Sequence, residues 1–396
     1  MGRTSLDKGP VRRSMTRRRR SGSLAGQECV PSIRWSTALR TAILSCGTLL
    51  ALFASIWTVQ AGETPDPRVP LNGVQVPLSA FASPEARVRL QEMLDAQARG
   101  EGPGQDIAAA RAFYDAQNSD RVARMRKLWP VRTSEQRFDG VLADVAEPAE
   151  GIAPANKGRV LINLHGGAFL WGARSGALAE AIPIAGVGRI KVVSVDYRQG
   201  PEYAFPAASE DVETVYRALL RDHRPQDIGI YGCSAGGYLT AQAVARLISK
   251  KLPLPGAIGT FCGALAAPDG DSIYTSPALE GQKVPAGPPR LSDYPYFRGA
   301  DLSDPLVFPA NSPALLARFP PTLLISGSRD FALSSVLRSH ALLDAAGVDA
   351  ELHVWDGMWH AFFVDPELPE SRQAYAVIWR FFDRHLGQAP IAGKGR

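Results

Sequence analysis

The residues that could do chemistry centre on the stretch YGCSAGGYLT, residues 231–240, where Ser234 has a glycine two positions away on each side. The stretch follows the apolar run IGIYG and opens AGGYLTAQAVARLIS, so it marks a tight turn from a strand into a helix. Such a turn strains its central residue and holds the hydroxyl out above the sheet edge, while the glycines let neighbouring chain approach. We predict that Ser234 is a nucleophile.

A serine hydroxyl is a weak nucleophile at neutral pH and needs a neighbouring base. The chain has six histidines, and His360 has the position that this role requires. It lies in DGMWHAFF, where a loop after the last predicted strand can reach back over the carboxyl edge of the sheet. Four others fall at predicted helix ends, inside a helix or within a strand: His223, His340, His353 and His385. We predict that His360 accepts the proton of Ser234.

The base needs an acid that orients it. Asp330 ends the run PTLLISGSRD, directly after an apolar strand, and therefore emerges at the carboxyl edge where ligand sites of open α/β sheets lie. Its alternative role is to cap the helix that begins near Phe331. Asp356 is the second candidate for the acid, but it lies only four residues before His360. We predict that Asp330 orients His360.

Attack on a carbonyl group creates a negative oxygen that backbone N–H groups can stabilise. The glycine-rich stretch LHGGAFLWG follows the predicted strand RVLINL and offers such groups. We predict an oxyanion hole formed by the N–H groups of Gly166, Gly167 and Ala168, together with the N–H group of Ala235.

The elements that position these residues form an alternating pattern after about residue 131. Short β-rich runs occupy residues 159–164, 191–195, 228–232, 256–262, 321–326 and 350–355. Helical stretches occupy residues 206–221, 235–250, 332–346 and 369–386. Several runs are apolar on both faces, as buried parallel strands are. Alternation of strand and helix predicts an α/β fold with a mostly parallel, doubly wound sheet.

Two regions lie outside this alternation. Residues 62–130 begin with a Pro-rich, extended stretch, then a helix with Ser83 as N-cap and Pro84 at its first position. Two further short helices are predicted in IAAARAFYDAQ and RVARMRKLW. Residues 265–320 are rich in proline and aromatic residues, as lids and binding loops often are. A variable surface loop is the alternative interpretation of residues 265–320.

Residues 1–61 differ in charge from the rest of the chain. They hold ten Lys and Arg but two Asp and Glu, whereas the remainder has 34 basic and 37 acidic residues, which excludes a nucleic-acid-binding body. Arginines at 12, 13 and 17–20 precede the uncharged stretch 41–61, with Met1 or Met15 as the start. A cleaved export signal and an N-terminal membrane anchor both fit; either places the body outside the cytoplasm and confines membrane contact to this segment.

The cysteines argue against a metal centre. Cys29 and Cys46 belong to the N-terminal segment, and Cys233 and Cys262 lack the spacing of a metal site. We expect no metal and no cofactor. Cys233 and Cys262 are expected to be buried small residues, with one disulfide between them as the alternative.

Five stretches together resemble the hormone-sensitive-lipase-like branch of the α/β-hydrolases, a family of bacterial carboxylesterases and acetyl esterases. They are HGGAF, VDYRQGPEYAFPAASEDV (195–212), GCSAGGYL, SGSRD and GMWHAF. The likeness runs from about residue 159 to the C-terminus, and the order Ser234, Asp330, His360 is that expected of α/β-hydrolases. The resemblance implies an α/β-hydrolase catalytic domain over residues 131–390, with Asp196 and Arg198 as structural supports. It also implies a helical cap, which residues 83–130 and 265–320 would form.

Three positions depart from the family pattern without removing a catalytic group. Ala168 stands at the usual third glycine, Cys233 at a frequent aspartate, and Phe331 at a frequent proline. The resemblance implies a serine hydrolase that cleaves small carboxylic esters of short to medium acyl chain, or lactones, through an acyl-enzyme. An amidase or formamidase with the same three residues is the alternative, and a non-catalytic ligand-binding protein on this scaffold is a more distant one.

Overall fold

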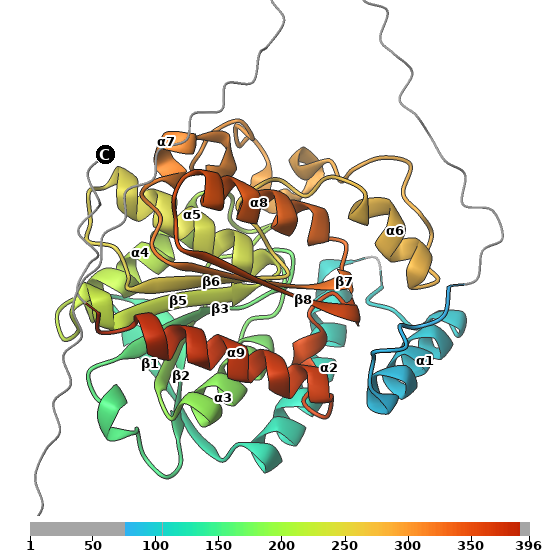
Figure 1. Cartoon of the computed structure of the whole chain (residues 1–396), viewed down its shortest axis with the longest axis horizontal. Coiled ribbons are helices and arrows are strands. Elements are labelled where there is room, and N and C mark those ends of the chain that lie inside the picture. The colour runs from blue at the N-terminus through green and yellow to red at the C-terminus, as the bar shows by residue number, and fades with distance from the viewer. Residues whose placement is uncertain (1–75, 105, 389–396) are drawn as a thin grey trace, which may run out of the picture. The chain divides into compact units, whose positions relative to one another are not determined.

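The computed structural model describes residues 76–104 and 106–388, with an eight-stranded sheet at the centre of this part (Figure 1). The strands are β1 (Val131–Phe138), β2 (Val141–Pro148), β3 (Val160–Leu164), β4 (Lys191–Val195), β5 (Ile228–Cys233), β6 (Ala257–Phe261), β7 (Thr322–Arg329) and β8 (Ala350–Trp359). Their order in the sheet is β1-β2-β4-β3-β5-β6-β7-β8. The six strands from β3 to β8 run parallel, which confirms the predicted mostly parallel sheet.

The first two strands form an antiparallel hairpin that the sequence analysis did not predict. A turn at Asp139 and Gly140 joins β1 to β2, and both residues have positive φ, 48° and 94°. An Asp-Gly pair suits this geometry because a two-residue hairpin turn needs positive φ at both positions. β2 then pairs antiparallel with β4 and extends the parallel sheet at one edge.

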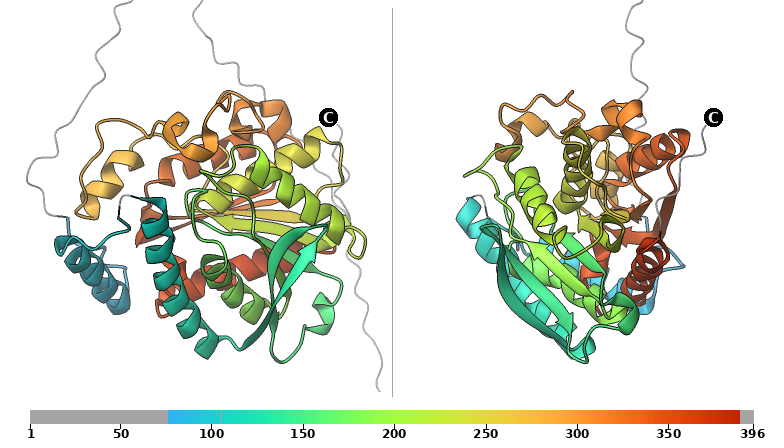
Figure 2. Two further views of the ribbon diagram at one scale, coloured as in Figure 1. Left: turned by 180° about the vertical axis from the view of Figure 1, so that it is seen from behind. Right: turned by 90° about the vertical axis from the view of Figure 1, so that its left-hand side faces the viewer.

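Helices cover both faces of the sheet, as the doubly wound prediction requires (Figures 1 and 2). One face carries α3 (Ser175–Gly188) and α9 (Pro369–His385), and the other carries α4 (Ala207–Leu219), α5 (Ala235–Ser249) and α8 (Leu333–Ala345). The central strands are buried over their whole length, β3, β5 and β6 among them. Burying one aliphatic side chain contributes about 1.5–3 kcal/mol, so this core fixes the strand ends that hold the site.

The remaining elements are outside the alternation. The helices are α1 (Pro84–Ala98), α2 (Ile107–Leu128), α6 (Ser272–Leu279) and α7 (Pro313–Leu316). Short 3-10 turns span Pro154–Asn156, Pro225–Asp227, Leu291–Asp293, Pro295–Phe297, Pro309–Asn311 and Phe362–Val364. The predicted start of α1 is confirmed, since the Ser83 side chain accepts a hydrogen bond from the N–H group of Ala86 and Pro84 follows.

The two short helices predicted after α1 are one continuous helix, α2. The stretch between them, residues 118–120, stays helical because its polar side chains bond to residues one turn further along. Arg121 donates to Asn118 Oδ1 at 3.1 Å, and Arg124 pairs with Asp120 at 2.9 Å. Such pairs stabilise a helix by about 0.2–0.5 kcal/mol each, enough to keep a polar stretch within it.

The N-terminal helix and the 265–320 insertion contact each other. Gln97, near the end of α1, donates to the carbonyl oxygen of Gly281 just after α6. The predicted export signal or anchor, residues 1–61, lies outside the described residues, as do residues 62–75 and 389–396. Within 76–104 and 106–388, none of the helices combines the length and the apolar sequence that crossing a bilayer demands.

Candidate active site

Ser234 occupies the turn between β5 and α5 with φ of 54° and ψ of −120°. This is a region that residues other than glycine seldom adopt, and the predicted strain at Ser234 is confirmed. Backbone hydrogen bonds hold the conformation on both sides: the Ser234 N–H group donates to Phe261 at 2.7 Å, and the Ser234 carbonyl accepts from Gly237 at 2.9 Å.

Gly232 and Gly236 are required because the backbone of Leu164, directly before the HGG loop, lies very close to both of them. A Cβ atom on Gly236 would lie 1.6 Å from the carbonyl oxygen of Leu164, and one on Gly232 would lie 2.3 Å from the same atom. Real Cβ atoms do not approach backbone this closely, so only glycine fits at either position. The contact brings the turn at Ser234 against the loop that follows β3.

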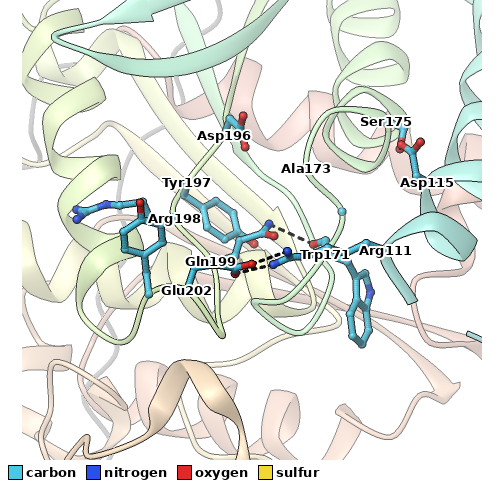
Figure 3. A pocket seen from close by; sticks show the side chains of 12 residues that line it. Arg111, Asp115, Trp171, Ala173, Ser175, Asp196, Tyr197, Arg198, Gln199 and Glu202 are labelled. Carbon is cyan, nitrogen blue, oxygen red and sulfur yellow. Dashed lines mark hydrogen bonds and ion pairs between the residues drawn. The ribbon is translucent and has the colours of Figure 1, made fainter. Parts of the chain in front are cut away.

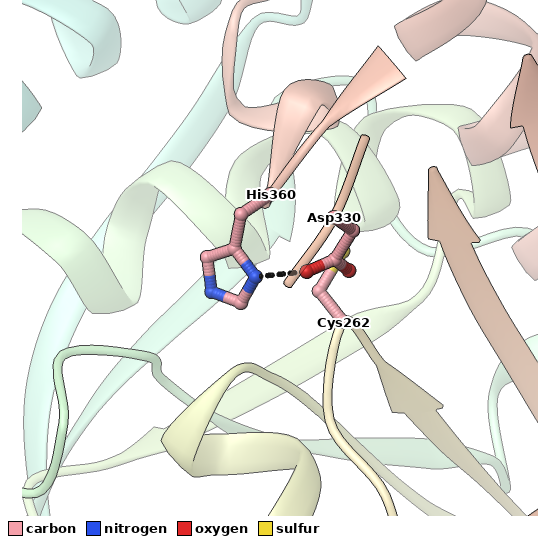
Figure 4. A group of neighbouring side chains, drawn as sticks. All are labelled: Cys262, Asp330 and His360. Carbon is pink, nitrogen blue, oxygen red and sulfur yellow. Dashed lines mark hydrogen bonds and ion pairs between the residues drawn. The ribbon is translucent and has the colours of Figure 1, made fainter. Parts of the chain in front are cut away.

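The structure brings Ser234, His360 and Asp330 together from three different loops. His360 Nε2 lies 2.9 Å from Ser234 Oγ. On the other side of the ring, His360 Nδ1 lies 2.7 Å from Asp330 Oδ1, and Figure 4 shows this contact. Asp356, the second candidate for the acid, instead accepts a hydrogen bond from the Ser328 hydroxyl at 2.9 Å. Of the two candidates, Asp330 is therefore the one that reaches the imidazole.

Asp330 is fully buried and bonded through both carboxylate oxygens. Oδ1 accepts from the N–H group of Ala332 at 2.9 Å as well as from His360, and Oδ2 accepts from the Ser326 hydroxyl at 2.8 Å. Burial by itself would raise the pKa of Asp330, but the nearby His360 and these hydrogen bonds outweigh it and lower the pKa below its ordinary value. An ionised Asp330 accepts only, so Nδ1 of His360 carries the proton and Nε2 presents its lone pair to Ser234.

The predicted oxyanion hole needs one correction. The N–H group of Gly166 donates to Glu180 Oε1 at 2.7 Å and is therefore not free to bind an oxyanion. The N–H groups of Gly167, Ala168 and Ala235 have no acceptor among the described residues. These three remain as candidate donors. Ala168, which stands at the usual third glycine of the motif, still adopts a positive φ of 54°, a conformation that glycine favours.

His165 supports this loop from inside the protein. It is fully buried and stacks on Tyr197 with ring centroids 4.3 Å apart. Its Nδ1–H group donates to the carbonyl oxygen of Gly166 at 2.7 Å, and Gln199 lies 3.2 Å from Nε2. Burial lowers the pKa of His165 to about 4, so the ring stays neutral and holds the loop.

Glu180 is a residue of this site that the sequence analysis missed. It lies on α3, beneath the HGG loop, where Oε1 accepts from Gly166 and Oε2 accepts from Asn163 Nδ2 at 3.1 Å. Burial raises the pKa of Glu180 to about 8. The available signal was a single carboxylate in the otherwise apolar run ALAEAIPIAG.

Arg198 has the structural role expected of it. Its side chain donates to Asp211 at 2.9 Å and to Glu210 at 3.2 Å, and its N–H group also donates to Asp211 at 2.8 Å. These bonds tie the loop after β4 to the first turn of α4. Asp196, also expected to be a support, lines a cavity behind the HGG loop.

That cavity has a volume of about 490 Å³ and lies between α2, the end of the HGG loop and residues 196–203 (Figure 3). Its charged and aromatic lining includes Arg111, Asp115, Trp171, Asp196, Arg198 and Tyr203. Arg111 closes one side of it by donating to the carbonyl oxygens of Leu170 and Gly200. Ser234, Asp330 and His360 do not line this cavity.

A smaller, apolar cavity of about 100 Å³ opens at Ser234 itself. Its walls come from the HGG loop, α5, the 265–320 insertion and the residue after Asp330. They include Ala168, Phe169, Ala235, Tyr238, Leu291, Tyr294, Phe297, Phe308 and Phe331. Phe331 stacks on His360 with ring centroids 4.2 Å apart, so the residue that replaces the family's frequent proline covers the imidazole.

Cys233 and Cys262 are both buried free thiols, and the alternative of a disulfide is not what the structure contains. Cys262 Sγ accepts a hydrogen bond from the N–H group of Ala361 at 3.3 Å. Cys262, Asp330 and His360 lie within 4.8 Å of one another, close enough to be considered as metal ligands (Figure 4). Burial raises the pKa of the Cys262 thiol well above its ordinary value, which opposes the thiolate that metal binding requires.

Arg329, directly before Asp330, is buried and bonds both to the 265–320 insertion and to the stretch before α1. Its Nη1 donates to the carbonyl oxygen of Leu279 at 2.9 Å, and its Nη2 donates to the carbonyl oxygen of Pro77 at 2.6 Å. The Ser276 hydroxyl donates to the carbonyl oxygen of Arg329 at 2.5 Å. The backbone that carries Asp330 is thus held by residues of the 265–320 insertion and by the stretch before α1.

Several known proteins resemble this chain. A family model described as alpha/beta hydrolase fold matches residues 161–364. An acetyl-hydrolase of Streptomyces hygroscopicus is 31% identical over 244 residues, 61% of this chain and 81% of that protein. The carboxylesterase/phospholipase LipF of Mycobacterium tuberculosis is 29% identical over 246 residues, 59% of this chain and 64% of that protein.

Solved structures agree with these relatives. The crystal structure of an esterase superimposes with a TM-score of 0.68 and 29% identity, covering 81% of this chain and 99% of that one. An esterase from the bacterial hormone-sensitive lipase family superimposes with a TM-score of 0.67 and 28% identity, covering 78% of this chain and 100% of that one.

Proposed function

Because the chain belongs to the hormone-sensitive-lipase-like branch of the α/β-hydrolase fold family, whose matched members are carboxylic ester hydrolases, we propose that Ser234, His360 and Asp330 are its catalytic triad. The observation that carries the proposal is the continuous hydrogen-bonded chain from Ser234 Oγ through His360 to Asp330, with distances of 2.9 and 2.7 Å.

In the first half of the reaction, His360 Nε2 takes the proton of Ser234 as Oγ attacks the ester carbonyl carbon. The tetrahedral intermediate then collapses, the bond to the alcohol oxygen breaks, and His360 returns the proton to the leaving alcohol. Ser234 is left as an acyl ester. In the second half, His360 activates water in the same way, and the acid leaves.

Asp330 acts by holding the Nδ1–H tautomer and by stabilising the imidazolium that forms in each half. The N–H groups of Gly167, Ala168 and Ala235 are the proposed oxyanion hole. Loss of one such donor typically lowers kcat by about 10²–10³-fold, so these amides matter nearly as much as the triad.

The size and lining of the cavity at Ser234 indicate that the substrates are small. Its volume of about 100 Å³ is well below the roughly 300–1,000 Å³ of pockets that hold drug-sized ligands. Its apolar aromatic walls suit the hydrocarbon part of an ester rather than a charged group. We therefore propose esters of short acyl chains, or small lactones, as substrates.

The sequence of residues 1–61 is an argument that the enzyme is exported. Arginines before an uncharged stretch that ends at Ala61 are typical of a signal peptide or an uncleaved anchor. We propose that the catalytic domain works outside the cytoplasm. Immunoblotting of periplasmic, membrane and medium fractions tests this: an exclusively cytoplasmic protein would contradict it, and the mass of the exported protein reports whether the segment was removed.

The decisive experiment is hydrolysis of p-nitrophenyl acetate, butyrate and longer esters by the full chain and by Ser234→Ala. We expect kcat/KM to fall at least about 10³-fold in the variant. Ser249→Ala, an exposed serine at the other end of α5, is the matched control and should retain full activity. Equal rates for Ser234→Ala and the unaltered chain would refute the assignment of the nucleophile.

Matched p-nitroanilides test the amidase alternative, because both reactions share an acyl-enzyme and differ in the bond that is cleaved. Faster cleavage of the anilides than of the esters would favour an amidase. A fluorophosphonate probe tests the non-catalytic alternative, since a functional triad becomes covalently labelled at Ser234. Failure of the unaltered chain to react with the probe would support a binding protein.

A further inference from the structure

We propose that Glu180 is a positioning residue of this active site: its buried carboxyl group fixes Gly166 in the oxyanion loop and must be uncharged for full activity. The inference rests on the proposed function, because it assigns a role relative to the oxyanion that attack by Ser234 creates. Glu180 touches neither the substrate nor the reacting atoms and acts through the loop.

The geometry places Glu180 one backbone group from the nucleophile. A Cβ atom on Gly166 would lie 3.4 Å from Glu180 Oε1 and 3.3 Å from Ser234 Cβ. Glu180 is only 8% exposed, and its oxygens accept from the Gly166 N–H group and from Asn163 Nδ2. The backbone of Cys233 also donates a hydrogen bond to the carboxyl group. Asn163 Oδ1 in turn accepts from the Ser194 hydroxyl at 2.5 Å, so the carboxyl group belongs to a buried network across β3 and β4.

These bonds determine which N–H groups face the substrate. The Gly166 N–H group points inward to Glu180, and the Gly166 carbonyl oxygen accepts from His165 Nδ1 at 2.7 Å. With both polar groups of Gly166 held, the following N–H groups of Gly167 and Ala168 stay available for the oxyanion. Without the Glu180 carboxyl group, the Gly166 N–H group would have no acceptor, or would turn toward the oxyanion and compete with Gly167 and Ala168 for it.

The surroundings of Glu180 contain dipoles and neutral groups but no compensating cation. Cys233 and Tyr231 face it from β5 and Tyr197 from the loop after β4, and burial together with Glu180 raises the pKa of each. His165 in the neighbouring loop is neutral because burial lowers its pKa. Among the described residues, α2, α9 and β2, which also pack near α3, supply no charge that acts on Glu180.

Deprotonation of Glu180 would therefore place a negative charge, with no cation beside it, close to the position where the oxyanion develops. Burial raises the pKa of Glu180 to about 8, so the group is mostly protonated at neutral pH and ionises in mildly alkaline solution. In the protonated form the Asn163 amide flips, so that its oxygen accepts from the carboxyl O–H and its NH₂ group faces Ser194. Two like charges at short range in a protein interior repel strongly. The rate should fall as the pH rises through the pKa of Glu180.

Glu180→Gln tests the charge while keeping the shape. The amide oxygen can still accept from Gly166, and its NH₂ group can face Asn163 if the Asn163 amide flips, because the Ser194 hydroxyl can then accept from Asn163 and donate to Ala177. Glu180→Ala tests the hydrogen bond. Glu370→Gln is the matched control: Glu370 is 7% exposed and also accepts a backbone N–H, that of Ser83 at 2.8 Å.

We measure kcat and KM for p-nitrophenyl butyrate from about pH 6 to 10, corrected for spontaneous hydrolysis. For the unaltered chain and for Glu370→Gln, we expect kcat to fall roughly tenfold or more across an alkaline limb near pH 8. Glu180→Gln should stay within about threefold of the unaltered chain at pH 7 and lack that limb. Glu180→Ala should lower kcat about 10–10²-fold with little change in KM.

An alkaline limb that is unchanged in Glu180→Gln would overturn the proposal. So would a Glu180→Ala protein that folds, as judged by circular dichroism, and keeps the kcat of the unaltered chain. If Glu180→Ala does not fold, the pH profile of Glu180→Gln decides alone.

A second readout separates this inference from the proposed function. Attack of Ser234 on a fluorophosphonate releases fluoride, transfers the serine proton to His360 and places negative charge on the phosphoryl oxygen in the same hole. If no ester is hydrolysed but the probe labels Ser234, the pH dependence of the labelling rate still tests Glu180. Labelling with the same alkaline limb in Glu180→Gln would again overturn the inference.

Discussion

Replacing Asp330 by asparagine should remove one charge from the triad and leave its hydrogen bonds almost intact. Oδ1 of Asp330 accepts from both His360 and Ala332, so an asparagine oxygen can take that position. The asparagine NH₂ group then takes the position of Oδ2 and donates to Ser326, whose hydroxyl can accept as well as donate. His360 keeps its tautomer, and the measured effect reports the charge of Asp330.

The expected loss follows from the separation of the two charges. Asp330 and the imidazolium of His360 are in direct contact at 2.7 Å, which puts their charge centres about 4 Å apart. At an effective dielectric constant near 20, two unit charges at that distance interact by about 4 kcal/mol. Since about 1.36 kcal/mol corresponds to a tenfold change in rate, kcat for Asp330→Asn should fall about 10³-fold.

The assay is steady-state hydrolysis of p-nitrophenyl butyrate at pH 7, with kcat and KM determined separately. KM should stay within about threefold because Asp330 does not contact the substrate. Asp356→Asn is the control, since Asp356 bonds to Ser328 outside the triad and its replacement should leave kcat unchanged. A loss of less than about tenfold in Asp330→Asn, or a larger loss in Asp356→Asn, would refute the reasoning.

Three further perturbations have defined outcomes. Gly236→Ala forces a Cβ atom against Leu164, so thermal unfolding should show a loss of about 3 kcal/mol or more, whereas Gly158→Ala, with open space around it, should be neutral or stabilising; equal melting curves would contradict the close contact. Leu291→Ala enlarges the cavity at Ser234, so the optimum of a p-nitrophenyl ester series should move to longer acyl chains, and an unchanged optimum would show that the acyl group lies elsewhere. Because the folded state raises the pKa of Glu180, the folded protein binds that proton more tightly than the unfolded chain, and its free energy of unfolding falls as the pH rises to about 8. Glu180→Gln should lack this fall and should be the more stable protein at pH 9 by a few kcal/mol in urea unfolding. Parallel stability–pH curves for the two proteins would contradict the raised pKa of Glu180.

The sequence predicted the elements whose local pattern matches their environment. Apolar runs with clear ends predicted all six parallel strands, and the placement of Ser234, Asp330 and His360 after three of those strands predicted that they would meet. The spacing of Gly232 and Gly236 predicted a close approach of neighbouring chain, which the structure provides at Leu164.

The helix α3 was not predicted because tertiary packing, rather than local preference, stabilises it. It contains Pro183 and ends in a glycine-rich stretch, and such residues disfavour an isolated helix. Close packing needs these small residues: a Cβ atom on Gly186 would lie 2.6 Å from Trp129, and one on Gly188 would lie 2.5 Å from Trp379. Since α3 was missed, the carboxylate of Glu180 that it carries was missed as well.

The availability of a backbone N–H group likewise depends on three-dimensional neighbours. Gly166 was predicted as an oxyanion-hole donor on its place in the HGG motif, but its partner Glu180 lies 14 residues further along the chain on another element. A motif identifies a glycine-rich loop, whereas the direction of each N–H group depends on which acceptors the fold brings against it.

The two hydrogen bonds of the Arg329 guanidinium set a practical limit on how far the chain can be shortened for expression. Pro77 lies upstream of the first helix, in a stretch that secondary structure alone would mark as dispensable. A recombinant chain that starts at Ser83 would deprive a buried cation, one position before Asp330, of an acceptor. Such a shortened protein should lose turnover while its sheet still folds, and a starting point upstream of Pro77 avoids that loss.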